Sequence, residues 1–238
     1  MDTPILPENE IEEITWQDDE NRATLFLRSV FVLLSGALIF RTLLLPTGGN
    51  WFAEIAKALI LMIVFPVAII WLFFGQGLRP VEWLTDQKYN AWNYGVNFRN
   101  WKSQLLWTMP LLVLGIIGVV LFKTIFLKGG SPMTPVEMLT ITLILWLSLI
   151  CLTWFLFGFL WFGCAQGFGP FVATVFVLTI LTYGIVESSK LQEVVLTISV
   201  YFPFVLLSSY ICWKQKSWIP ILYTVILLAP IASCIFMY

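Results

Sequence analysis

Residues 136–163 read VEMLTITLILWLSLICLTWFLFGFLWFG, and Glu137 is the only charged residue among them. An apolar run of about 20 residues is long enough to cross the hydrocarbon core of a bilayer as an α-helix. Inside a bilayer a helix also satisfies all of its own backbone hydrogen-bonding groups. This stretch therefore predicts a long, aromatic, membrane-spanning helix, and it sets the fold class of the chain.

The rest of the chain repeats this pattern. Hydrophobic residues make up 59% of the 238 residues and charged residues 11%, with a mean hydropathy of +0.89. Soluble domains carry about 25% charged residues, so a water-soluble fold is excluded. The sequence predicts an all-α, polytopic transmembrane helix bundle with about seven spans, within a transmembrane domain at residues 24–238. Besides 136–163, the spans are expected at residues 24–46, 51–75, 105–127, 171–186, 194–213 and 218–238.

Charge is distributed unevenly between the first residues and the rest. Residues 1–23 contain eight acidic residues and one basic residue, a charge of −7, whereas the remainder has six acidic and twelve basic residues, a charge of +6. The acidic tail is not a signal peptide, because it has neither a basic start nor an apolar segment. It is also unsuited to nucleic acid or anionic lipid, which attract positive charge. We expect no nucleic-acid partner.

The distribution of Lys and Arg predicts the orientation of a multi-pass protein. With a cytoplasmic N-terminus, eight basic residues fall on the cytoplasmic side and five on the other. We therefore expect the N-terminus in the cytoplasm and the C-terminus outside. On the N-terminal side, residues 76–104 combine Trp and Tyr with four basic and two acidic residues. This composition predicts an interfacial loop at the lipid headgroups, and a docking surface for a partner is the alternative.

Catalytic chemistry has little support in the sequence. The chain has no histidine, the commonest general base and zinc ligand. Ionisable residues in the middle of a span would mark function, and the sequence places none there. Glu54 and Lys57 lie one helical turn apart near the start of a span, where we expect them to neutralise each other. We expect no catalytic residue, no metal site and no small-molecule cofactor.

The remaining polar residues of the spans favour structural roles. Threonines inside membrane helices are expected to hydrogen-bond to their own helix or to a neighbouring one. The four cysteines lie in or at the ends of apolar runs without CxxC spacing, so we interpret them as small membrane-helix residues. No GxxxG-type spacing is prominent within the expected spans.

Three short motifs nevertheless resemble a known family. They are FGFL at residues 157–160, FGP at 168–170, and YICWKQKSWIP at 210–220. In order and spacing they resemble the motifs of the CAAX-protease and bacteriocin-immunity intramembrane proteases, over residues 70–238. The resemblance implies a helix bundle that, in the family, holds Glu, Arg, His and Asn groups for peptide hydrolysis.

Every catalytic group of that family is missing from this sequence. The positions of the paired Glu, the Arg, the first His, and the last His and Asn are occupied here by Leu152 and Thr153, Phe157, Tyr183 or Gly184, Val225 and Ala229. A barrier reduction of about 8 kcal/mol or more needs an acid, a base or a metal. The resemblance therefore implies a degenerate member, a pseudoprotease that keeps the bundle without the activity.

The leading functional prediction is a non-catalytic integral membrane protein that acts as a binding, scaffold or assembly subunit of a membrane protein complex. Its expected partners are lipid and other integral membrane proteins. Two alternatives remain: an active CAAX-protease-like peptidase with atypical residues, and a component of a transporter or channel. The absence of charge in the middle of the spans argues against transport.

Two regions are predicted to bind the partner. Trp154, Phe157 and Trp161 lie at positions i, i+3 and i+7 of the longest span, which places them on one face of an α-helix. We expect this aromatic stripe to face lipid and to be the main contact surface; packing within the protein's own bundle is the alternative. The acidic tail is expected to act as a secondary clamp through Glu10, Glu12, Glu13, Asp18 and Asp19.

Overall fold

The part of the chain described by the computed structural model is helical throughout. It comprises residues 22–45, 51–70, 95, 101–126, 135–186 and 197–237, and these contain no β-strand. The prediction of an all-α bundle is confirmed. The helices are α1 (Arg22–Leu44), α2 (Trp51–Leu59), η1 (Ile60–Val64), α3 (Phe65–Ile69), α5 (Trp101–Phe126), α6 (Pro135–Thr153), η3 (Trp154–Trp161), α7 (Phe162–Phe168), α8 (Pro170–Val186), η4 (Thr197–Tyr201), α10 (Phe202–Gln215) and α11 (Ile219–Met237).

Several of these elements join end to end, and each of the seven predicted spans coincides with one helical segment of the described chain. Four segments are long and apolar enough to cross a membrane: Thr24–Leu44, Phe52–Ile69, Trp101–Thr124 and Thr142–Phe168. Two shorter apolar helices are Pro170–Tyr183 and Ile219–Ile235. These lengths and compositions are those of a membrane protein.

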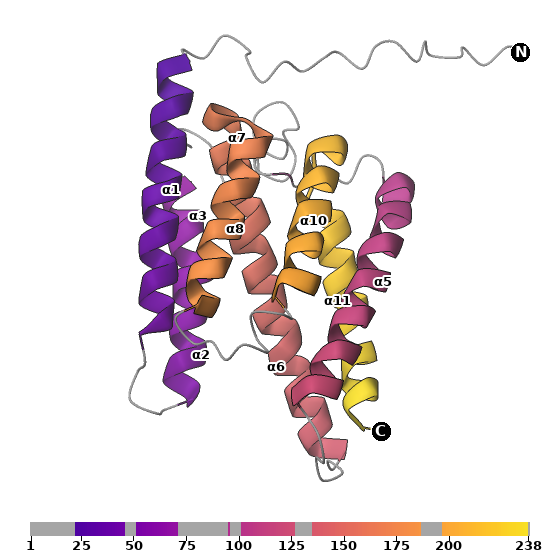
Figure 1. The fold of residues 1–238 in the computed structure, drawn as a ribbon. Coiled ribbons are helices and arrows are strands. Elements are labelled where there is room, and N and C mark those ends of the chain that lie inside the picture. The colour runs from indigo at the N-terminus through magenta and orange to yellow at the C-terminus, as the bar shows by residue number, and fades with distance from the viewer. Residues whose placement is uncertain are drawn as a thin grey trace, which may run out of the picture.

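Successive segments run in opposite directions along the bundle (Figure 1). We call the end that contains the turn at residues 214–217 the upper end; α1, α5, α8 and α11 begin there, and α7 and α10 finish there. At the lower end α2, α6 and η4 begin. The composite helix α6–η3–α7 rises through the middle, between α1 on one side and α5 with α11 on the other.

The composite helix is widened at its centre. Residues Trp154–Trp161 form a π-helix, in which hydrogen bonds join residues five apart. Gly158 leaves room for the Trp154 ring, which a Cβ atom at that position would overlap. Phe155, Phe159, Trp161 and Phe162 are fully buried around this segment and form the centre of the core.

Two further π-helices of the described chain, η1 and η4, each precede a proline. η1 ends two residues before Pro66, and η4 ends two residues before Pro203. A proline cannot donate to the carbonyl four residues earlier, and its ring clashes with it. Widening of the preceding turn relieves that clash at η1 and η4, whereas α5 and α11 accommodate Pro110 and Pro230 without a π-helical turn.

Two predicted boundaries are wrong. Residues 164–170 were expected to form a connection, but α7 continues to Phe168 and Gly169 alone separates it from α8. Gly169 has φ +84°, and its N–H donates to the Ala165 carbonyl over 3.0 Å, which ends the helix. Residues 101–104 of the expected interfacial loop belong to α5. Of residues 76–100, the structure describes Gly95 alone.

Because α7 extends beyond the expected span, it contains a GxxxG pair that the expected spans did not include. Gly163 and Gly167 lie four residues apart on α7 and face α1. A Cβ atom on Gly167 would approach the Leu25 carbonyl oxygen to 2.7 Å, and one on Gly163 would approach Val32 to 2.8 Å. The close approach of the two helices allows the Ser29 hydroxyl to donate a hydrogen bond to the Gly163 carbonyl over 2.7 Å. Small residues here allow α1 to pack backbone to backbone.

Candidate functional site

The aromatic stripe of the longest span lies inside the bundle. Trp161 is 0% exposed and Phe157 is 3% exposed, while Trp154 is partly buried against the core. The Trp161 indole donates to Thr174 Oγ1 of α8 over 3.1 Å. The expectation that this stripe faces lipid is therefore wrong. The reason is that α1, α8 and α10 all pack against η3, which places the stripe inside the bundle.

The prediction that the three residues of the stripe share one face assumed α-helical periodicity. Trp154, Phe157 and Trp161 all belong to the π-helix η3. A π-helix has more residues per turn than an α-helix, so positions i, i+3 and i+7 no longer share one face. The acidic residues predicted to form the clamp lie outside the described residues: Glu10, Glu12, Glu13, Asp18 and Asp19.

The positions that the protease resemblance singled out are mostly interior. Thr153, Phe157, Val225 and Ala229 are buried, whereas Tyr183 is exposed. Within the described part of the chain, every buried polar residue is Ser, Thr or Gln, and no Asp, Glu, Lys or Arg is buried. The same residues contain no group of three His, Cys, Asp or Glu side chains arranged to hold a metal ion. All four cysteines are free, and Cys234 is exposed.

Hydroxyl groups in the spans bond mainly to carbonyls of their own helix, as predicted. Thr140, Thr174, Thr179 and Thr182 each donate to the carbonyl four residues earlier, over 2.7–2.9 Å. These bonds occupy the hydroxyl protons that a nucleophile would have to lose.

Helix α11 is joined to its neighbours by polar bonds. The hydroxyls of Thr142 on α6 and Ser233 lie 2.5 Å apart, and the Trp146 indole of α6 donates to the Ile226 carbonyl over 3.1 Å. Lys123 of α5 donates to the Ile235 carbonyl over 2.6 Å. In lipid, where apolar contact alone does not hold helices together, such bonds fix α11 in place.

The upper end of the bundle is organised around the turn between α10 and α11. Gly95 has φ +69°, and its carbonyl accepts hydrogen bonds from the Ser217 hydroxyl and the Trp218 amide, both over 3.0 Å. A Cβ atom at Gly95 would overlap the Phe162 ring. The Trp218 ring packs against Trp154, with centroids 5.8 Å apart. Gly95 therefore contacts both this turn and the core residue Phe162.

Next to this turn, α5 and α10 expose lysines and aromatic rings. The Lys214 ammonium lies 4.9 Å from the centroid of the Trp107 ring and 5.9 Å from that of Tyr210. Ser103 donates to Gln215 Oε1 over 3.3 Å. Lys216 ends α10 in the left-handed conformation, φ 50°, and burial lowers the pKa of its ammonium group.

The lower end contains the predicted ion pair. Lys57 Nζ lies 2.6 Å from Glu54 Oε2 and also donates to the Leu45 carbonyl over 2.5 Å. The two charges thus neutralise each other, as expected at a span boundary. The Lys57 ammonium also caps the end of α1.

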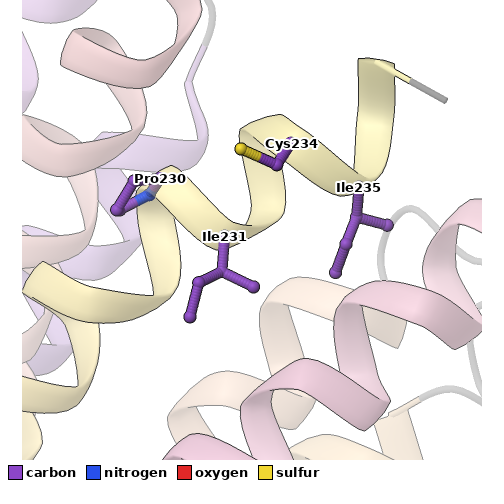
Figure 2. A pocket seen from close by; sticks show the side chains of 4 residues that line it. All are labelled: Pro230, Ile231, Cys234 and Ile235. Atoms are coloured by element: carbon purple, nitrogen blue, oxygen red, sulfur yellow. The ribbon is translucent and has the colours of Figure 1, made fainter.

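A hollow of about 590 Å³ lies beside the last turns of α11. Its lining is apolar and consists of Pro230, Ile231, Cys234 and Ile235, shown as sticks in Figure 2. The hollow is broad and open, and the residues lining it supply a single thiol as a reactive group. Its lining offers space for an apolar chain but no set of side chains that could carry out a reaction.

Taken together, these features define a helical membrane protein whose described interior holds no charged side chain. No family model, no curated protein and no protein of solved structure matches the chain.

Proposed function

We propose that the chain is a non-catalytic integral membrane protein that binds another integral membrane protein, as a scaffold or assembly subunit. The observation that carries the proposal is the filling of the bundle centre. Phe155, Phe159 and Trp161 are completely buried there, and Phe157, Val225 and Ala229 are also buried. If the resemblance to the CAAX-protease family holds, these last three occupy positions that a protease would need for polar groups. Without an acid, a base or a metal in that interior, binding is the function that the arrangement supports best.

The contact surface is assigned to the outer face of α1 in place of the buried stripe. Leu27, Phe31, Leu34 and Leu38 are exposed there, and we call them the α1 stripe. Their spacing of four, three and four residues is the heptad pattern by which one helix packs along another. Helix α1 lies at the edge of the bundle, where a partner helix can reach it (Figure 1).

The acidic tail leads directly into this helix. Its charge of −7 requires a basic surface on the partner, and Glu10, Glu12, Glu13, Asp18 and Asp19 would supply the contacts. An exposed ionic contact of this kind weakens as salt is added. The tail and the α1 stripe are continuous in sequence, so one partner can engage both.

Site-specific photo-cross-linking in the native membrane tests the proposal, because lipid can also cover an apolar helix face. A photoreactive residue replaces Leu34 in one variant and Leu106 in another; Leu106 is equally apolar and exposed, but lies on α5. We expect a discrete protein adduct from position 34 and lipid adducts alone from position 106. Leu27→Ala with Leu38→Ala should abolish the protein adduct while the chain stays inserted.

Deletion of residues 1–20 should reduce the same adduct mainly at low ionic strength. Two results would contradict the proposal: lipid adducts alone at position 34, or the same protein adducts at both positions. The first result would show that the α1 stripe faces lipid, and the second that its contacts with protein are not specific.

A further inference from the structure

The upper end of the bundle holds a pair of exposed lysines on two adjoining helices. Lys102 lies in the first turn of α5, and Lys214 lies in the last turn of α10. The hydrogen bond from Ser103 to Gln215 joins these two turns directly. Lys102 and Lys214 are the sequence neighbours of the two residues that form this bond, and both lysines are exposed at this end of the bundle.

Aromatic rings restrict both ammonium groups. Lys214 lies over Trp107 from α5 and Tyr210 from α10, whose rings meet edge to face with centroids 5.8 Å apart. Lys102 Nζ lies 5.8 Å from the centroid of the Trp101 ring. Cation–π contacts hold a charge in place without neutralising it, so both lysines can still attract an anion.

The described residues around this upper-end surface carry positive charge. Lys216 follows Lys214 in the same turn. The two acidic residues within the described ranges, Glu54 and Glu137, belong to α2 and α6, which begin at the opposite end of the bundle. An anion approaching the upper end therefore meets a net positive field from the described residues.

The depth of the surface in the bilayer follows from its aromatic residues. Trp101, Tyr210 and Trp213 are exposed around the lysines, and such amphipathic rings concentrate at the level of the lipid headgroups. Directly below them α5 exposes Leu105, Leu106 and Met109, which suit acyl chains. A ligand here would have a negative head and an apolar tail.

We propose that the upper-end surface that carries Lys102 and Lys214 binds the phosphate headgroups of anionic phospholipids. The two ammonium groups would donate hydrogen bonds to the phosphate oxygens, and the acyl chains would lie along the outer face of α5. The site is independent of the α1 stripe, since α1 takes no part in it.

Lipid selectivity measured by electron paramagnetic resonance tests this assignment. The full-length protein is reconstituted in phosphatidylcholine vesicles with a trace of spin-labelled phosphatidylglycerol, or of spin-labelled phosphatidylcholine as the reference. We expect the wild type to prefer phosphatidylglycerol and the preference to fall with added salt. A lysine near a membrane surface contributes about 1 kcal/mol toward anionic lipid, so each Lys→Gln substitution should cost up to about fivefold at this site.

The double variant Lys102→Gln with Lys214→Gln should bring the preference close to that for phosphatidylcholine, whereas Lys57→Gln at the lower end should leave it unchanged. Lys102→Arg with Lys214→Arg should keep the preference, because the charge is retained. The proposal is overturned if the double Gln variant keeps the wild-type preference, or if Lys57→Gln lowers it equally. Loss in the Arg variant would indicate packing, and competition by inorganic phosphate at constant ionic strength would indicate a soluble-anion site.

Discussion

At the scale of single residues, the contact between Gly167 and α1 is a constraint that side-chain rotation cannot relieve. A Cβ atom there would meet the Leu25 carbonyl oxygen at 2.7 Å and the Phe26 Cα at 2.9 Å. Both are backbone atoms that can move only if the whole helix moves. By contrast, a Cβ atom on Gly115 of α5 would meet the methyl groups of Leu228, which can rotate away.

This difference predicts that a Gly→Ala substitution affects stability unequally at the two positions. Gly167→Ala should lower the free energy of unfolding by about 1–3 kcal/mol, the usual cost of overpacking. Gly115→Ala should change it by less than about 1 kcal/mol, because the gain in helix propensity offsets the rearrangement of Leu228. Unfolding in mixed micelles with increasing denaturing detergent measures both. Equal losses for the two variants would contradict a backbone-limited contact between α1 and α7.

At the scale of helices, Lys123 determines how firmly the end of α11 is held. Its ammonium group donates to the Ile235 carbonyl, one of the last four carbonyls of the helix, which have no partner within it. Lys123→Met keeps the apolar stem and removes this bond. We expect amide hydrogen exchange to rise about tenfold in the final turn of α11, as the loss of about 1.4 kcal/mol of local stability implies.

The matched control is Lys57→Met, which removes a similar bond to the Leu45 carbonyl at the end of α1. That variant should raise exchange near residues 42–45 and leave α11 unchanged. If Lys123→Met leaves exchange in α11 at the wild-type rate, the lysine does not cap the helix.

The helices themselves could be predicted from the sequence, since long apolar runs have few other structures available in lipid. Their boundaries were missed where uncharged polar or small residues continue a helix, as at Gln104 and Gln166. The buried face of the longest span was missed for a different reason. Residues 138–163 are apolar on all sides, so no periodicity distinguishes the core face from the lipid face. The π-helix then changed the register that the prediction assumed.

The candidate binding surfaces were harder to predict from the sequence. Gly163 and Gly167 carry GxxxG spacing that the sequence does show, but Gly163 was taken as the end of a span and Gly167 as part of a connection. The pairing of Lys102 with Lys214 depends on α5 lying beside α10, and more than one hundred residues separate the two lysines. The predicted role of the acidic tail stays a prediction, since residues 1–21 lie outside the described chain.

At the scale of the whole molecule, the alternation of the helices relates the two ends to the two sides of the membrane. The upper end has Arg22, Arg28, Lys102, Lys214 and Lys216, and the lower end has Arg41, Lys57 and Lys123. Glu54 neutralises Lys57, and Lys123 is engaged with the α11 backbone, which widens the difference in available positive charge. Positive charge near span ends is retained in the cytoplasm. The upper end is therefore expected to be cytoplasmic.

Cysteine labelling in intact cells with a membrane-impermeant maleimide measures this orientation. Ser103→Cys reports on the upper end and Phe52→Cys on the lower end, because both positions are exposed. Cys234 is replaced by Ser in both variants, since it is the exposed native thiol. We expect Phe52→Cys to react from outside, and Ser103→Cys to react only after the membrane is permeabilised. Reaction of both from outside would contradict the alternating bundle. Reaction of Ser103→Cys alone would keep the bundle but reverse its orientation, and the anionic lipid would then have to come from the outer leaflet.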